Sequence, residues 1–193
     1  MDHYFDAMFD YINQIWAIPD GDKDVCRLFF KPILVKKDTI LESEGKIPLY
    51  HNFIVSGYMR NFHRDEKGNE VTVDLNNGPR FFTSYFHFMN RSVSNENLQC
   101  LSDCEILRIS RDDVDRSAEM GETQKDYTIK ILQQIMEQEK ERIQDMGNLT
   151  AEQRYLKLMR NQPNIIRNVP LKYIASFLGI KPESLSRIRK EIT

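Results

Sequence analysis

VPLKYIASFLGIKPESLSRIRK, residues 169–190, constrains the architecture of this chain more tightly than any other segment. Ile174 and Phe177 recur at helical spacing, which predicts a short amphipathic helix. Gly179 can take the left-handed conformation that ends such a helix, and Pro182 suits the first turn of a second one. Two helices joined by a turn of about three residues are typical of a helix-turn-helix unit.

The second helix of this unit is expected to turn Leu185 and Ile188 toward the first and to leave its polar residues open. The candidate DNA-binding residues are therefore Lys181, Glu183, Ser184, Ser186, Arg187, Arg189 and Lys190. A helix that is polar outside and basic toward its end can lie in the major groove of DNA. A helical hairpin with a solvated charged face has the same geometry, so the spacing alone leaves both readings open.

The residues of this segment resemble a known motif. Ile-Ala-Ser-Phe-Leu-Gly-Ile (174–180), followed by Glu-Ser-Leu-Ser-Arg, is similar to the helix-turn-helix of the Crp/Fnr family of bacterial transcription regulators. The resemblance implies that Arg187 donates to a guanine edge, that Glu183 accepts from a cytosine amino group or orients the arginine, and that Ser186 touches a base or phosphate. Side-chain geometry favours these pairings. Pro182 stands where some members carry a further base-reading arginine, so their target sequence cannot be copied.

Charge is distributed unevenly along the 193 residues, whose net charge is −2 at pH 7. Residues 151–193 contain nine Lys or Arg and three Asp or Glu, against 18 and 26 in the rest of the chain. An acidic body with a basic end is typical of a sensor that carries a DNA-binding head, although a charged helical tail gives the same asymmetry. The length and a hydrophobic content of 40% favour two domains with a buried core.

Short β-branched and aromatic runs alternate with turn residues from about residue 33 onward. Strands are expected at residues 33–35, 40–41, 53–56, 58–64, 71–75, 97–101 and 106–110. Such spacing indicates an antiparallel sandwich or barrel. Phe53 to Arg60, with a glycine between two strands, and the Gly68-Asn69-Glu70 turn resemble the cyclic-nucleotide-binding-like β-roll that precedes the helix-turn-helix in Crp/Fnr proteins.

Helical patterns flank these strands. Apolar residues at helical spacing over 5–16 predict a first helix, which Pro19-Asp20-Gly21-Asp22 is expected to end, and a short helical piece around Val25 follows. Another short helix is expected to start at Arg111-Asp112-Asp113, and the longest helical pattern covers about 123–146.

The a and d heptad positions of this long helix form an apolar stripe, with Glu139 interrupting it at a d position. Its members are Ile129, Leu132, Met136, Ile143 and Met146. The stripe packs either on the β-roll or on a second copy of the chain. In the resembling family the equivalent helix forms the homodimer interface.

Gly147-Asn148 is expected to break the long helix and to act as an interdomain hinge, with Thr150 capping the next helix. Little sequence follows the second helix of the motif, so we expect a truncated wing and weaker, less salt-sensitive DNA binding than a winged form has. The expected fold is α+β. An N-terminal antiparallel β-roll, a double-stranded β-helix with flanking helices, covers 1–120. A dimerisation helix covers 121–147, and a helix-turn-helix domain covers 148–193.

A ligand site is harder to infer. Family members that bind cyclic nucleotides carry a Gly-Glu pair for the ribose and an Arg-Ser or Arg-Thr pair for the phosphate. Residues 81–88 contain no acidic side chain, so nucleotide binding is not expected. The aromatic residues here fit a core or an apolar pocket for a different small molecule. The candidate effector residues are Phe82, Thr83, Ser84, Tyr85, Arg91 and Ser92.

Other classes of function find no support in the sequence. Cys26, Cys100 and Cys104 are irregularly spaced, so buried reduced thiols are expected instead of a disulfide framework, a metal site or an iron–sulfur cluster. Catalytic motifs such as Gly-x-Ser-x-Gly and His-Glu-x-x-His are absent, so neither an enzyme nor a cofactor is expected. No leader or membrane-length apolar run is seen, which predicts a cytoplasmic protein.

Together these features predict a homodimeric bacterial transcription regulator that binds palindromic double-stranded DNA. A small-molecule effector and RNA polymerase are its candidate further partners. Two alternatives stay open: a regulator that responds to cyclic nucleotides, and a small-molecule-binding module whose helical end docks a protein partner.

Overall fold

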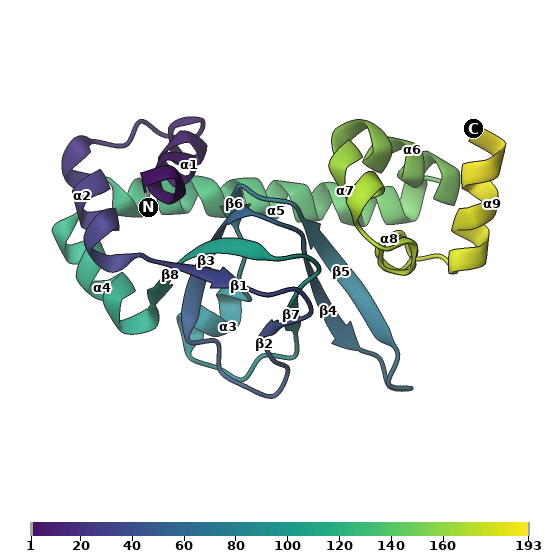
Figure 1. Ribbon diagram of the computed structural model, residues 1–193, viewed down its shortest axis with the longest axis horizontal. Helices are drawn as coiled ribbons and strands as arrows, with labels where there is room; N and C mark the ends of the chain where they lie inside the picture. Colours follow the sequence, from purple (N-terminus) through teal and green to yellow (C-terminus); the bar gives the residue numbers. More distant parts are fainter. Residues whose placement is uncertain (1, 193) are drawn as a thin grey trace.

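The computed structural model describes residues 2–192 and shows a β-roll between two groups of helices (Figure 1). The helices are α1 (Asp2–Asn13), α2 (Asp20–Phe29), α3 (Tyr85–Asn90), α4 (Arg111–Met120), α5 (Gln124–Asn148), α6 (Ala151–Asn161), α7 (Pro163–Asn168), α8 (Leu171–Phe177) and α9 (Pro182–Ile192). The strands are β1 (Lys31–Val35), β2 (Ile40–Glu42), β3 (Tyr50–Ser56), β4 (Met59–Arg64), β5 (Glu70–Asn76), β6 (Arg80–Phe81), β7 (Asn97–Cys100) and β8 (Cys104–Ser110).

The strands form two antiparallel sheets, one in the order β1-β8-β3-β6 and the other in the order β2-β7-β4-β5. We call them the first and the second sheet. Side chains alternate across β3, so that Ile54 packs in the roll interior with Met59 and Leu98, whereas Phe53 faces the helices. The centre of β3 is therefore buried on both faces, which explains the apolar run of Phe53, Ile54 and Val55.

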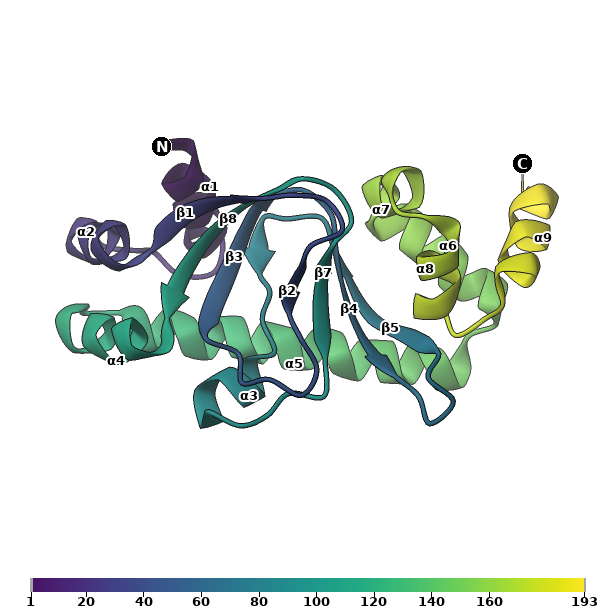
Figure 2. The same ribbon diagram turned by 60° about the horizontal axis from the view of Figure 1, so that its bottom comes forward.

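Helix α5 runs along the β-roll and connects α4 with the C-terminal helices (Figure 1 and Figure 2). Tyr127 and Ile131 on one side of α5 are buried against α1, α2 and the outer face of the first sheet, together with Met8 and Ile12 of α1. This contact fixes α5 on the roll over its first two turns.

Helices α6 to α9, which we call the head, form a compact unit at the opposite end (Figure 1). Thr150 and Gln153 make a reciprocal capping box that starts α6, with N–H to side-chain oxygen distances of 2.9 and 3.2 Å. Tyr155, Ile174 and Leu185 belong to a common core that holds the helices together.

The seven expected strands are present, and the long helix, the Thr150 cap and the helix that begins at Arg111 are confirmed. The strand β6 and the helices α3 and α7 were not predicted. β6 has only two residues, directly after Pro79, so its sequence carries no periodicity to detect.

Two expected boundaries were wrong. Gly147-Asn148 does not break α5, because the helical hydrogen bonds continue until Leu149 N–H donates to the carbonyl oxygen of Asp145. The change of direction lies at 149–150, where Thr150 starts the next cap. Pro19-Asp20-Gly21-Asp22 likewise does not end α1, which stops at Asn13; Asp20 and Asp22 instead lie in the first turn of α2, where carboxylates suit the helix dipole.

Candidate DNA-binding interface

The turn between α8 and α9 is held by a Schellman motif around Gly179. The N–H of Ile180 donates to the carbonyl oxygen of Ala175, and the N–H of Gly179 to that of Ser176, each at 3.0 Å. Gly179 has φ +70°, a left-handed conformation that glycine adopts without steric cost. Pro182 begins α9, as predicted. The local sequence thus ends one helix and starts the next within a few residues.

Arg154 of α6 stabilises this turn through hydrogen bonds to the backbone. Its Nε and Nη2 donate to the carbonyl oxygen of Leu178 at 3.2 and 3.0 Å, and its Nη1 donates to that of Leu149 at 2.6 Å. One guanidinium thereby joins the end of α8, the start of α6 and the end of α5. Sequence reasoning missed this residue, because an arginine on an amphipathic helix usually reads as a solvated charge.

Helix α9 turns one apolar side to the head and its polar side to solvent. Leu185 is fully buried and Ile188 half-buried in the head core. Of the seven predicted DNA-binding residues, Ser184 is half-buried and the other six are exposed. Within residues 2–192, no ion pair or hydrogen bond engages the side chains of Glu183, Ser186 or Arg187.

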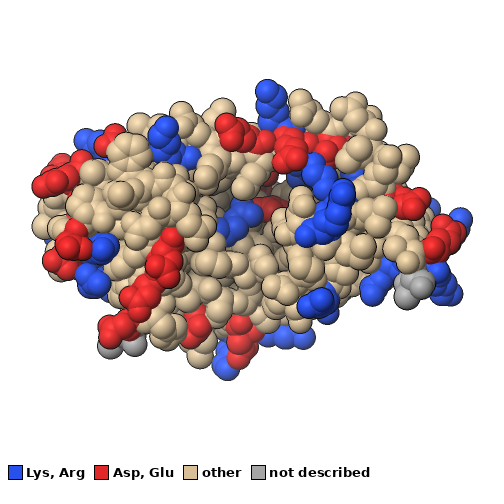
Figure 3. Space-filling model, turned by 90° about the horizontal axis from the view of Figure 1, so that it is seen from above, with Lys and Arg blue, Asp and Glu red and all other residues tan. Residues whose placement is uncertain are grey.

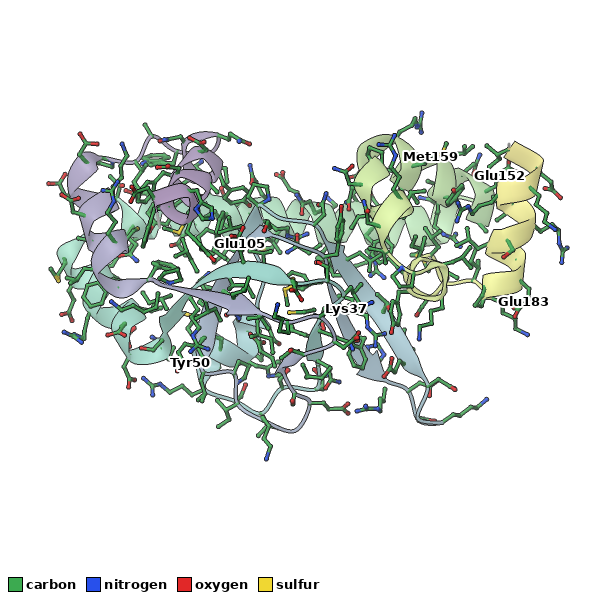
Figure 4. The ribbon with its side chains drawn as sticks, in the orientation of Figure 1. Lys37, Tyr50, Glu105, Glu152, Met159 and Glu183 are labelled. Atoms are coloured by element: carbon green, nitrogen blue, oxygen red, sulfur yellow. The ribbon has the colours of Figure 1, made fainter. Side chains whose placement is uncertain are left out.

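These three side chains start at the α8–α9 turn and follow the first two turns of α9. Figure 4 shows Glu183 at the end of α9 that adjoins the turn, directed away from the other helices. Seen from above, the end of the molecule that contains the helices α6 to α9 carries Lys and Arg side chains as well as Asp and Glu (Figure 3). The exposed face thus offers one acid, hydroxyls and several cations, which is the donor and acceptor mixture that base edges and phosphates require.

The head docks on the edge of the second sheet through α8. The N–H of Thr72 in β5 donates to Ser176 Oγ at 2.9 Å, and the amide of Asn168 donates to Tyr58 Oη at 2.7 Å. The bond to Thr72 covers part of β5, an edge strand whose backbone would otherwise face solvent.

Arg60 of β4 lies at the centre of this contact. Its guanidinium carbon is 3.9 Å from the ring centroid of Phe62 and 3.9 Å from that of Tyr173 in α8, so the cation is stacked between the roll and the head. The side chain is also ion-paired with Glu70. Arg60 is 2% exposed, so its charge is balanced mainly by Glu70 and the two rings. No pattern in the sequence predicts this role.

The predicted stripe on α5 divides into two groups. Ile129, Met136 and Ile143 lie seven residues apart and are 54%, 71% and 69% exposed. Leu132 instead borders a cavity beside the roll. Met146 lies next to Gly179: a Cβ added to Gly179 would be 2.7 Å from the Cε of Met146. Ile129, Met136 and Ile143 thus form an apolar row, exposed to solvent, on one side of the helix that leads to the head.

The six candidate effector residues do not form one site. Thr83 and Tyr85 line the cavity beside α5, whereas Phe82 packs in the roll interior. Arg91 is ion-paired with Asp112 at 2.6 Å on the surface. Separately, Ser84 is buried and its N–H donates to Glu42, and Ser92 bonds to the ring of His87. Arg91-Ser92, the fragment similar to the Arg-Ser pair that binds the phosphate in family members, therefore already has partners within the protein.

A buried polar cluster fills part of the roll interior instead. The Glu42 carboxyl group accepts from the amide of Asn52 at 2.9 Å and from the N–H of Ser84 at 3.2 Å. Burial raises the pKa of Glu42 to about 8, although these hydrogen bonds oppose the shift. The cavity beside α5 contains a second perturbed group, because burial lowers the pKa of His51 to about 4. Neither residue stood out in the sequence.

The structure gives little support for a disulfide framework, a metal site or a membrane-spanning helix. The cysteines Cys26, Cys100 and Cys104 are free and buried, as expected. Among residues 2–192, no cluster of three or more His, Cys, Asp or Glu side chains is arranged to hold a metal ion. None of the helices described combines the length and apolar character that a membrane crossing requires.

An antiparallel β-roll, a long helix along it and a compact helical head with helix-turn-helix geometry define the fold class of Crp/Fnr regulators. Solved structures of that class superpose on the chain. The global regulator CLP from Xanthomonas campestris has a TM-score of 0.71 at 13% identity, covering 90% of this chain and 91% of that one. FixK2 from Bradyrhizobium japonicum has a TM-score of 0.70 at 14% identity, covering 84% of each chain.

The Catabolite Activator Protein of Thermus thermophilus is also similar, with a TM-score of 0.56 at 15% identity over 90% of this chain and 83% of that one. No protein-family model and no curated protein sequence matches the chain. The likeness therefore shows the Crp/Fnr-like fold, which confirms the fold class expected from the sequence.

Proposed function

We propose that this protein is a sequence-specific DNA-binding transcription regulator of Crp/Fnr type that acts as a homodimer. One observation carries the proposal: Glu183, Ser186 and Arg187 are exposed, have no side-chain partner within residues 2–192, and lie together on the outer face of a helix whose inner face packs in the head core. Here their order fits a guanine acceptor pair and a neighbouring cytosine amino group.

The open row of Ile129, Met136 and Ile143 supports the homodimer. Exposed apolar residues that recur every seven residues are typical of one of the two positions by which a helix packs on a second helix in a coiled coil, and a second α5 would cover them. Two heads related by a two-fold axis would read a palindrome whose half-sites lie about one DNA turn apart.

The contacts between roll and head support a two-state mechanism. The Arg60 stack and α5 join the sensor to the head directly. A signal in the roll that changes the position of α5 would change the separation of the two α9 helices, and with it the affinity for DNA.

DNA affinity measured over a range of salt concentrations tests the proposal. About three phosphate contacts per protomer would give a slope of about −5 in a plot of log K against log salt. Absent or salt-insensitive binding to DNA would instead favour the module whose helical end docks a protein partner.

Cyclic nucleotide binding is the second candidate to be tested. We propose that the roll does not bind these ligands, since Arg91 pairs with Asp112 and Glu42 already bonds Asn52 and Ser84 inside the roll. Calorimetry with cyclic AMP and cyclic GMP checks this, and a micromolar Kd for either would refute it.

A further inference from the structure

The corner between β7 and β8 contains a pair of cysteines in the sequence Cys-Leu-Ser-Asp-Cys, residues 100–104. Cys100 ends β7 of the second sheet and Cys104 starts β8 of the first, so the corner joins the two sheets. Both side chains are fully buried in the same cluster of the roll interior. Their thiols are free and hydrogen-bonded to each other. The fold thus holds two reduced sulfur atoms next to each other.

Cys104 is the more reactive thiol of this pair. The hydrogen bond from Cys100 lowers the pKa of Cys104, and the same bond raises the pKa of Cys100. The thiolate is the form of cysteine that attacks an oxidant. On one side, Cys104 Sγ is covered only by the half-buried Gly57, where an added Cβ would be 2.6 Å from the sulfur. A local opening of the turn between β3 and β4 would therefore expose this sulfur to a small oxidant.

The same corner supports the contact between the roll and the head. Leu101, between the two cysteines, is 7% exposed and belongs to the same core cluster as Tyr155 of α6. Its N–H donates to the carbonyl oxygen of Tyr58 at 2.7 Å, and Cys104 Sγ donates to that oxygen at 3.6 Å. Tyr58 Oη in turn accepts from the amide of Asn168 in α7. Cys104 is therefore bonded directly to a residue that binds the head.

We propose that Cys100 and Cys104 form a reversible disulfide on reaction with a peroxide, and that this bond loosens the head from the roll. The Cys104 thiolate attacks hydrogen peroxide, the O–O bond breaks, and a sulfenic acid forms while the other oxygen leaves as water. The Cys100 sulfur then displaces the hydroxyl group of the sulfenic acid, which leaves as a second water. Both sulfurs are oxidised and both peroxide oxygens are reduced, so the reaction needs no further reagent.

This disulfide would change the corner in two ways. Cys104 would lose the hydrogen that it donates to the carbonyl oxygens of Tyr58 and Ser102, at 3.6 and 3.3 Å. An S–S bond of about 2.0 Å would also draw the ends of the corner together, which would move Leu101 within the head core. Both changes remove support from Tyr58 and so weaken its bond to the head.

Mass spectrometry of the full chain after treatment with hydrogen peroxide tests the disulfide. Free thiols are alkylated under denaturing conditions before digestion with trypsin, which leaves both cysteines in one peptide, residues 92–108. We expect this peptide to take up no alkyl group until dithiothreitol has reduced it. Burial raises the pKa of Cys26 to about 11, so Cys26 should stay reduced. Cys26→Ser is thus the matched control and should form the bond, whereas Cys104→Ser should not.

Hydrogen exchange at Thr72 tests the effect on the head, because its N–H donates to Ser176 Oγ across the contact. This amide should exchange about tenfold faster in the oxidised protein, since one interface hydrogen bond contributes about 1 kcal/mol. The rate should return with dithiothreitol, which reduces a disulfide but not an oxidised methionine. Treated Cys104→Ser should show no change, and Cys100→Ala replaces it if it does not fold.

The proposal is overturned if both cysteines remain alkylated after treatment, if they reach sulfinic acid without bonding, or if the bond joins two chains. Equal exchange of Thr72 in the oxidised and reduced protein would overturn the coupling to the head. The disulfide and its effect on the head are independent of the proposed function. A chain that forms the bond but binds no DNA would therefore reject that function and leave this assignment standing.

Discussion

Single side chains on α9 carry the proposed reading of DNA. Replacing Arg187 by alanine removes a guanidinium that has no partner within the described part of the chain, so folding should not change. Loss of a bidentate guanine contact should cost about 1–3 kcal/mol on the preferred sequence and little on random DNA. Lys190→Ala is the matched control and should weaken both kinds of DNA alike. Competition binding assays with the two DNAs measure the difference, and equal losses for Arg187→Ala would refute base reading.

Glu42 should make stability depend on pH. Its pKa is about 8 in the folded protein, against 4.5 for a free side chain, so the folded state binds the extra proton. Stability is therefore expected to fall as pH rises between about 4.5 and 8. Burial lowers the pKa of His51 from 6.5 to about 4, so His51 acts in the opposite sense only below pH 6.5.

Between pH 6.5 and 8, Glu42 should therefore affect the free energy of unfolding while His51 does not. Urea denaturation across this window should show declining stability in the wild type and a flatter dependence in Glu42→Gln. The exposed variant Glu66→Gln serves as control and should retain the wild-type slope. A Glu42→Gln variant with the same slope as wild type would show that this carboxyl group is not responsible.

Elements with strong local signals could be predicted from the sequence, and those formed by distant contacts could not. Gly179 and Pro182 specify the α8–α9 turn within a few residues, so its geometry followed from local rules. Tyr173, more than a hundred residues later, stacks on Arg60 and helps to bury it. His51 and Gln124 likewise line one cavity, although they are distant in the sequence. Contacts between residues so far apart leave no periodic pattern in the sequence. For the same reason the candidate effector residues, which were chosen from neighbouring positions, did not form one site.

The Schellman turn makes a prediction about two glycines. Gly179→Ala should destabilise the head by about 1–2 kcal/mol, because alanine is strained in the left-handed conformation and its Cβ would meet the Cε of Met146 at 2.7 Å. Gly147 lies in α5, where an added Cβ would have no described neighbour within 4 Å. Gly147→Ala should therefore stabilise the folded protein by about 0.5–1 kcal/mol. Thermal denaturation of the two variants should give shifts of opposite sign; shifts of the same sign would contradict the assigned conformations.

The whole molecule is expected to work as a pair. Met136→Glu places a charge in the middle of the open row on α5, where the side chain is 71% exposed in one chain and would be buried in a dimer. Sedimentation velocity should then show a monomer, and binding to a palindromic site should weaken because only one head can engage. Gln144→Glu adds the same charge outside the a and d positions and should leave the dimer intact. A Met136→Glu dimer as stable as wild type would place the interface elsewhere.

Selection of bound sequences from a pool of random double-stranded DNA by the purified full chain tests the reading of DNA by α9 most directly. We expect enrichment of a palindrome whose half-sites are about one helical turn apart and contain a guanine that Arg187→Ala no longer requires. A pool that stays random after repeated rounds, or one whose enriched sequence is the same for wild type and Arg187→Ala, would contradict it.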